Sequence, residues 1–151
     1  MPDIDFAILA DAAEARPGEK FSVLGGGVSR ISGRGFPLVH PHLALVVGLL
    51  VTSAEVGRDH ELRFLLLGPD GTQTADATGA IRAEGQSETG DQVVTFAVDF
   101  WNLTFPVPGE YSFRILVGGS ERKRIPLMIG GIFPPGEAPG GDAAGARRFD
   151  A

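Results

Sequence analysis

Three consecutive glycines, Gly25 to Gly27, follow the apolar run Phe21–Leu24 and raise the question of a phosphate-binding loop. A Walker-type loop needs Lys and then Ser or Thr after its last glycine, to supply an ammonium group and a magnesium-bound hydroxyl. Val28 and Ser29 stand there instead. A dinucleotide-binding loop needs a helix after its glycines, and no helical pattern follows. The glycines therefore predict a bulge or a sharp bend in a strand, not a nucleotide site.

The histidines are the candidate metal ligands. His40 and His42 flank Pro41, and alternate residues of a strand project to one side, so two imidazoles could share a divalent metal there. A third ligand would have to come from His60 or from a carboxylate elsewhere in the chain. Pro41 also marks the entrance of a strand, where histidines are commonly unliganded. We predict no metal site, and the sequence leaves open whether the three histidines meet in space.

Acidic residues are scattered over predicted turns, as in calcium-binding sandwiches whose loops gather carboxylates at one end. They are Asp3, Asp5, Asp59, Asp70, Asp76, Asp91 and Asp99. No dense Asp-x-Asp-x-Asp-Gly loop is present, and turn formation already accounts for Asp70 and Asp91. No serine lies in a Gly-x-Ser-x-Gly elbow, and neither Ser29 nor Ser112 has a His-Asp partner by order or spacing. We predict no catalytic residue and no cofactor, and a hydrolase stays open as an alternative.

Charge and cysteine content narrow the class of protein. The chain has 19 acidic and 13 basic residues and a net charge of -6, so we do not expect it to bind nucleic acid. The basic run Arg122–Arg124 beside Glu121 predicts a solvated hairpin strand that discourages edge pairing. With no cysteine, the chain has no disulfides, thiolate metal sites or thiol nucleophiles.

The N-terminal segment and the apolar runs predict a cytoplasmic protein that does not bind membranes. The first twenty residues carry acidic side chains where a signal peptide needs positive ones. The longest apolar run, Leu43–Val51, is far shorter than the ~20 residues that cross a bilayer.

Strand-length apolar runs recur between clusters of Gly, Pro and Asp, with almost no helical periodicity. The clearest run, residues 92–103, places Val94, Phe96, Val98 and Phe100 on one face and Trp101 on the other. Turns are predicted at the Gly-Pro-Asp-Gly and Gly-Gly-Ser-Glu segments, residues 68–71 and 118–121.

The first run is expected to bury Ile4, Phe6 and Ile8 on one face and to direct Asp3, Asp5 and Ala7 the other way. About eight such strands, without helical crossovers, predict an all-β fold: a two-layer antiparallel β-sandwich of immunoglobulin-like or Greek-key type. We assign it to residues 1–131. Residues 132–151, rich in Pro, Gly and Ala, are predicted to be a separate tail that builds no core.

The segments "AILADAAEARPGEKFSVLGGGVSRI" and "LTFPVPGEYSFRILVGG" resemble a family of small uncharacterised bacterial proteins, a domain of unknown function with sandwich-like architecture. The resemblance covers roughly residues 4 to 129, and the Ala-Asp-Ala and Leu-Gly-Gly-Gly elements are its most distinctive parts. It implies the sandwich fold and supplies no catalytic residues.

Two regions show more apolar surface than an isolated sandwich needs. Leu43–Val51 is apolar on both faces, and Trp101 points outward with Val93 and Ala97, so we expect a tail, a loop or a second subunit to cover them. The candidate interaction surface is Val47, Leu49, Val93, Trp101 and Leu116. The predicted function is a non-enzymatic protein-interaction or assembly module with a protein partner or a homo-oligomer. A carbohydrate- or calcium-binding sandwich is the alternative.

Overall fold

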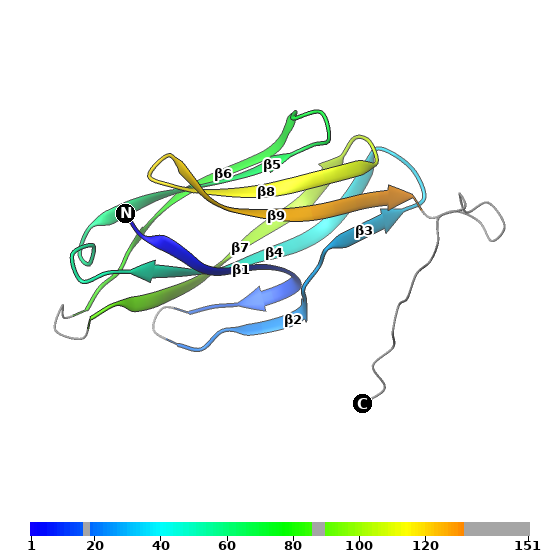
Figure 1. Cartoon of the computed structure of the whole chain (residues 1–151). Helices are drawn as coiled ribbons and strands as arrows, with labels where there is room; N and C mark the ends of the chain where they lie inside the picture. The colour runs from blue at the N-terminus through cyan, green and yellow to red at the C-terminus, as the bar shows by residue number, and fades with distance from the viewer. Residues whose placement is uncertain (17–18, 86–89, 132–151) are drawn as a thin grey trace, which may run out of the picture.

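The structure is a computed structural model, and it describes residues 1–16, 19–85 and 90–131. Nine β-strands and no helix form within these residues (Figure 1), so none of them builds a helix that could cross a membrane. The strands are β1 (Asp3–Glu14), β2 (Ser22–Gly26), β3 (Arg30–Gly33), β4 (Leu38–Val51), β5 (Asp59–Leu67), β6 (Gln73–Arg82), β7 (Gln92–Phe105), β8 (Gly109–Val117) and β9 (Ser120–Gly131). The predicted all-β class is confirmed. The predicted tail, residues 132–151, lies outside the described residues.

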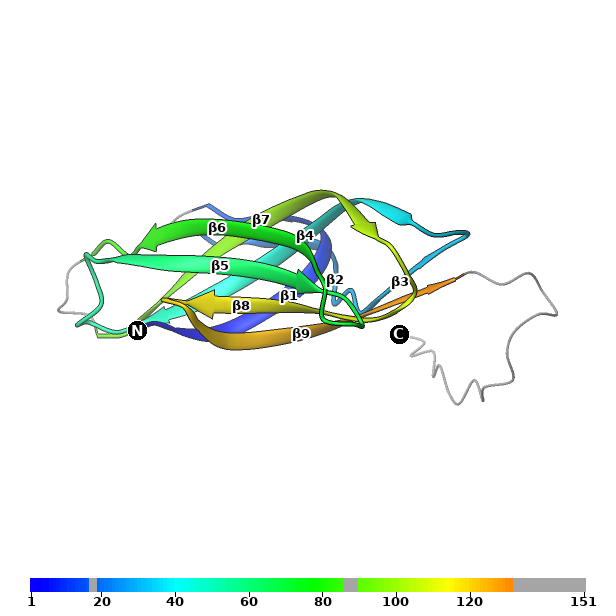
Figure 2. The same cartoon turned by 90° about the horizontal axis from the view of Figure 1, so that it is seen from above.

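The strands form two facing sheets (Figures 1 and 2). Sheet A has the order β2-β1-β4-β7 and sheet B the order β3-β9-β8-β5-β6. Neighbouring strands are antiparallel except β3 and β9, where Arg30–Gly33 runs parallel to Met128–Gly131. The predicted immunoglobulin-like sandwich is confirmed, with one short parallel pair.

The core lies between the two sheets and follows the period of two predicted for the later strands. In β8 the side chains of Tyr111, Phe113, Ile115 and Val117 are buried, while the residues between them are half-buried. The Tyr111 hydroxyl donates a hydrogen bond to the Val107 carbonyl oxygen at 2.7 Å, which ties the turn before β8 to the core. The tyrosine thus brings a large apolar body into the core and keeps its polar end satisfied.

The turns predicted between strands are confirmed. The Gly71 amide donates to the Gly68 carbonyl at 3.0 Å in the β5–β6 connection. Gly118 and Gly119 have φ of +57° and +84° and connect β8 to β9 in a two-residue hairpin. Both φ values lie in the left-handed region that glycine adopts without steric cost.

The triple-glycine element carries the chain from sheet A to sheet B. Gly25 and Gly27 have φ of +61° and +85°, and a Cβ atom on Gly25 would overlap the Asp11 carboxylate. The amides of Gly27 and Val28 both donate to the Leu9 carbonyl, at 2.8 and 2.9 Å. The chain then enters β3 with no helix after Val28. The predicted bend is confirmed, and it is a switch between layers.

The expected facing of the first strand is wrong, because the β1–β4 register shifts at a bulge between Ile4 and Phe6. Ile4 packs against the core, whereas Phe6 pairs with Gly48 on the outer side of sheet A. The missing side chain at Gly48 makes room for the Phe6 ring, which a Cβ atom there would overlap. Ile8 follows Phe6 to the outer side, and Ala7 and Leu9 take the core positions.

Candidate protein interaction surface

The two outward surfaces of the sandwich differ in chemistry, so we name them. The A face is the outer side of sheet A, and its apolar residues are Phe6, Ile8, Ala10, Phe21, Leu24, Ala44, Val46, Gly48, Val93, Ala97 and Trp101; the polar residues His42, Thr95 and Asp99 share this side. The B face is the outer side of sheet B; its charged residues are Glu61, Arg63, Asp76, Arg114, Glu121 and Arg124, and the apolar residues Leu65, Leu116 and Met128 share this side. The outer side of an antiparallel sheet is normally polar, so the A face is the exception that needs an explanation.

The centre of the A face is small, flat and apolar. Val46 pairs with Ile8 of β1 and Ala97 of β7 and has no exposed surface. At one end the Phe6 ring covers Gly48 and stacks on Phe21, with ring centroids 5.5 Å apart. The neighbouring strands therefore cover the middle of β4, and this explains the apolar character of β4 on its second side.

The exposed part of the A face lies at its margins. Leu24 on β2 is 73% exposed, and Trp101 and Val93 on β7 are 67% and 46% exposed. These are large apolar side chains that folding leaves in water. Leu24 lies on the edge strand opposite the one that carries Val93 and Trp101, so these side chains occupy two margins of the A face and do not form one continuous patch.

Trp101 is held in place by polar neighbours. The His42 ring stacks on the Trp101 indole with centroids 4.1 Å apart, and His42 Nε2 lies 2.7 Å from Asp99 Oδ1. Asp99 and Trp101 belong to β7, and His42 pairs across from Trp101 on β4. Two strands thus fix the indole before any partner binds, which reduces the conformational entropy lost on binding.

The predicted interaction residues are only partly brought together. Val93 and Trp101 are exposed on the A face, as predicted, and Leu116 is half-buried on the outer side of sheet B. Val47 and Leu49 are wrong as surface residues, because both are fully buried in the core between the sheets. The run Leu43–Val51 is apolar on both faces, so its pattern could not tell which residues face sheet B.

The sequence did not single out Leu24, Phe21 or Phe6 as surface residues. Phe6 was expected in the core, and the bulge moved it outward. Leu24 pairs with Ala12 at the edge of sheet A, but its apolar neighbour Val23 and the glycines concealed which side it faces. The only available signal was the glycine at position 48, which can indicate that a neighbouring ring packs across a strand.

The B face carries ion pairs where the A face carries apolar side chains. Arg63 donates to both Asp76 carboxylate oxygens, at 3.1 and 2.8 Å. The hydrogen bond from Arg63 lowers the pKa of Asp76 below its ordinary value. Arg114 and Arg124 both approach Glu121, at 3.3 and 3.7 Å. This surface is adapted to water, because its charges are neutralised by neighbours at solvent-exposed positions.

His40 and His42 do not share a face. His40 pairs with buried Leu103, whereas His42 pairs with exposed Trp101. Between these pairs Asn102 has a φ of +52°, and this irregularity changes which side the following residues face. The expected shared projection of the two imidazoles is therefore wrong. Across residues 1–16, 19–85 and 90–131, no three His, Asp or Glu side chains are arranged to hold a metal ion.

The third histidine belongs to a different layer. His60 on β5 has its Nε2 2.9 Å from the Glu55 carbonyl oxygen. The Glu55 carboxylate accepts a hydrogen bond from the Thr52 amide at 2.8 Å and pairs with the Met1 amino group at 2.8 Å. The hydrogen bond from that amino group lowers the pKa of Glu55 to about 2. These contacts tie the β4–β5 loop to the start of the chain.

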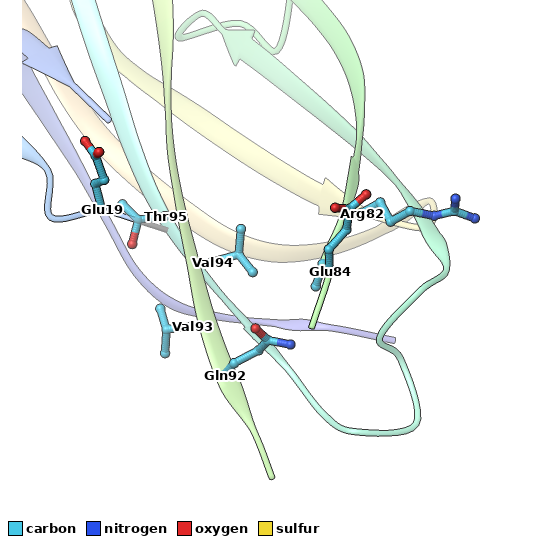
Figure 3. A pocket seen from close by; sticks show the side chains of 8 residues that line it. Glu19, Arg82, Glu84, Gln92, Val93, Val94 and Thr95 are labelled. Carbon is cyan, nitrogen blue, oxygen red and sulfur yellow. The ribbon is translucent and has the colours of Figure 1, made fainter. Parts of the chain in front are cut away.

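One cavity of about 600 Å³ lies where β6 ends and β7 begins. Its lining residues are Glu19, Arg82, Ala83, Glu84, Gln92, Val93, Val94 and Thr95. Figure 3 shows the Arg82 guanidinium directed away from the other labelled side chains, and Arg82 Nε lies 3.2 Å from Asp59. The described residues that line it include no serine and no histidine, and its one side-chain hydroxyl, on Thr95, lies in the same lining as the carboxylates of Glu19 and Glu84.

A groove of about 310 Å³ lies between β6 and β7 at one side of the sandwich. Its lining residues are Leu62, Phe64, Ala77, Thr78, Gly79, Ala80, Ile81, Phe96 and Val98. Both strands are at the edges of their sheets. The core is therefore not closed on this side, where Phe96 and Val98 remain half-buried.

The sequence pattern of a family of unknown function, DUF6941, matches residues 5–130. The chain belongs to DUF6941. The predicted resemblance to a family of unknown function with a sandwich fold is thus confirmed over nearly the same residues. No curated protein matches the chain.

Two solved structures show a weak similarity to this DUF6941 chain. An immunoglobulin-like protein from Pseudomonas aeruginosa is 13% identical, with a TM-score of 0.36, over 82% of this chain and 96% of that one. The alkylpurine DNA glycosylase AlkC from Pseudomonas fluorescens, solved bound to DNA containing an abasic site analog, is 13% identical with a TM-score of 0.40. That match covers 67% of this chain and 27% of the glycosylase. Likenesses this weak transfer no function.

Proposed function

We propose that this DUF6941 protein is a non-enzymatic, cytoplasmic β-sandwich that works through protein contacts made by the A face. The observation that carries the proposal is that the two edge strands of the A face leave the large apolar side chains Leu24, Val93 and Trp101 exposed. The B face, built on the same fold, is charged and internally paired. A difference between two faces of one sandwich is not required by folding, so it supports a role in binding.

The rigid seating of Trp101 supports the same role. Aromatic side chains, tryptophan above all, are enriched among the residues that dominate the energy of protein interfaces. Trp101 is already ordered by the His42 ring and by the strand pairing beneath it. A partner that covers the indole would gain apolar burial without first ordering the side chain.

Co-purification of the protein with its partners from the native cell tests the proposal. The wild-type chain is compared with a Leu24→Ser/Trp101→Ser variant and with Met128→Ser, a matched control that removes an exposed apolar side chain from the outer side of sheet B. We expect the wild type and Met128→Ser to retain a stoichiometric protein partner, or a second copy, and the double variant to lose it. Equal recovery by all three would refute the A face as the contact surface.

Carbohydrate binding is the second candidate, favoured by one observation: an exposed indole beside the Asp99 carboxylate and the His42 imidazole, groups that could receive the hydroxyls of a stacked sugar. Trp101 is the only tryptophan in the chain, so its fluorescence reports on this position alone. Saturable quenching or enhancement by a saccharide panel, abolished in Asp99→Asn, would favour this function over protein contacts.

A further inference from the structure

Among the residues that the structure describes, β7 is the longer of two long strands that pair on one side only, the other being β6. Strand β7 spans 14 residues and ends sheet A, with its free side next to the open groove. Unpaired edges are templates for another strand, and proteins commonly block them with short strands, prolines or lysines. The edges β2 and β3 on the opposite side have only 5 and 4 residues. Strand β7 has neither proline nor lysine, and its one charge is Asp99.

The part of β7 with regular backbone geometry can pair with the same part of a second copy of the chain. Asn102, with its positive φ, ends the regular backbone, and Ala97 lies midway between the exposed residues Val93 and Trp101. Antiparallel pairing about a twofold axis at Ala97 places Trp101 opposite the partner's Val93 at both ends. The same register places Asp99 opposite the partner's Thr95, so no like charges meet.

In the same register, the core-facing side chains of β7 lie opposite apolar side chains of the partner's β7. Phe96 comes opposite the partner's Val98, and Val94 comes opposite the partner's Phe100. Phe96 and Val98 are the half-buried residues that line the open groove. Pairing would cover them and satisfy the free backbone groups of the edge at the same time.

We propose that two copies of this protein pair through β7, antiparallel and centred on Ala97, so that their A sheets continue into one another. This inference rests on the proposed function and names the partner as a second copy of the chain. Strand β6, the other long edge, is less suited to the role. It has Gly79 near its middle, and its Asp76 is already engaged by Arg63.

Disulfide trapping tests the register, because the chain has no cysteine of its own. Residues directly opposed in antiparallel strands have Cα atoms about 4.5–5.5 Å apart, within reach of a disulfide. Ala97→Cys is therefore expected to form covalent dimers under mild oxidation at micromolar concentration. Val93→Cys alone should not, because its two copies would be about 27 Å apart. A mixture of Val93→Cys with Trp101→Cys should cross-link between the two variants.

Charged substitutions of Ala97, the residue at the proposed twofold axis, test the same register without a covalent bond. Ala97→Lys and Ala97→Glu each place like charges opposite one another, so each alone is expected to be monomeric by light scattering. Their mixture is expected to restore a dimer, because the two charges then attract. Restoration by mixing also shows that neither variant is simply misfolded.

A wild-type chain that is monomeric by light scattering, with no Ala97→Cys cross-link, would overturn the inference. Equal cross-linking of Val93→Cys and Ala97→Cys would overturn it too, because that pattern indicates random collision. If the native chain instead retains a different protein through the A face while Ala97→Cys stays monomeric, the proposed function stands and only this pairing falls.

Discussion

The A and B faces use the same backbone arrangement with opposite surface chemistry. Both are outer sides of antiparallel sheets around one core, but Val46 at the centre of the A face has no exposed surface, while Arg63 on the B face is ion-paired in water. The B face shows what folding requires of an outer surface. Folding does not require the additional exposed apolar side chains of the A face, so we attribute them to binding.

A carboxylate introduced on the A face should lower the free energy of unfolding much more than one introduced on the B face. Val46→Asp places a charge among Ile8 and Ala97 with no cationic partner, and we expect a loss of about 3 kcal/mol or more in the free energy of unfolding. Leu65→Asp is the matched change on the B side, where the position is half-buried and its cross-strand neighbours are Arg114 and Asp76, the latter already paired with Arg63. Its loss should be less than half as large in chemical denaturation. Equal losses would show that the two faces are equally solvated.

The packing of Phe6 over Gly48 can be tested by a double-mutant cycle. Gly48→Val introduces a side chain where the Phe6 ring lies, and overpacking of this kind typically costs about 1–3 kcal/mol. In the Phe6→Ala background the space is free, so the same change should cost much less. Denaturant unfolding of the four proteins measures the coupling. Additive effects would mean that the ring does not pack over Gly48 in solution.

The Arg63–Asp76 pair on the B face should affect the pKa of Asp76 more than it affects the stability of the protein at neutral pH. Its pKa is lowered in the folded protein, so the pair's contribution to stability is present above the ordinary pKa of aspartate and is lost as pH falls through the lowered value. Arg63→Gln should return the Asp76 pKa toward its ordinary value, as measured by NMR titration. The melting temperature at neutral pH should change little, because the pair is exposed. An unshifted Asp76 in the wild type would contradict the geometry.

The smallest effect on stability is expected for an exposed side chain of the A face. Trp101→Ser removes an indole that is 67% exposed, so the free energy of unfolding should change by less than about 1 kcal/mol. A large loss in thermal denaturation of the monomer would mean that Trp101 serves folding and not contact. That result would remove the main distinction between the two faces.

The sequence predicted the fold well where alternation and turn chemistry agree. Strand β8 alternates without interruption and is bounded by glycine turns, so its buried face could be assigned directly. The glycines at positions 25 to 27 could be assigned to a bend because Val28 stands where a phosphate loop needs lysine and no helical pattern follows. In these places local rules and tertiary packing require the same conformation.

The candidate surface could be predicted only in part, because single-residue irregularities reverse the facing of a strand. The bulge after Ile4 sent Phe6 outward, and the positive φ at Asn102 separated His40 from His42. Gly48, Asn102 and Pro41 are compatible with such irregularities, but these residue types alone do not specify which way the flanking side chains turn. Val47 and Leu49 were misplaced for a different reason: a run that is apolar on both sides carries no periodicity from which to choose a face.

The parallel alignment of β3 with β9 determines how the sandwich would resist mechanical load. Ser32 pairs with Gly130 and Gly33 with Gly131, so both strands run in the same direction along the edge of sheet B. Opposed pulling forces on the start of β3 and the end of β9 slide the strands past each other and stretch their hydrogen bonds together. An antiparallel hairpin such as β8–β9, pulled from its open end, would yield one bond after another.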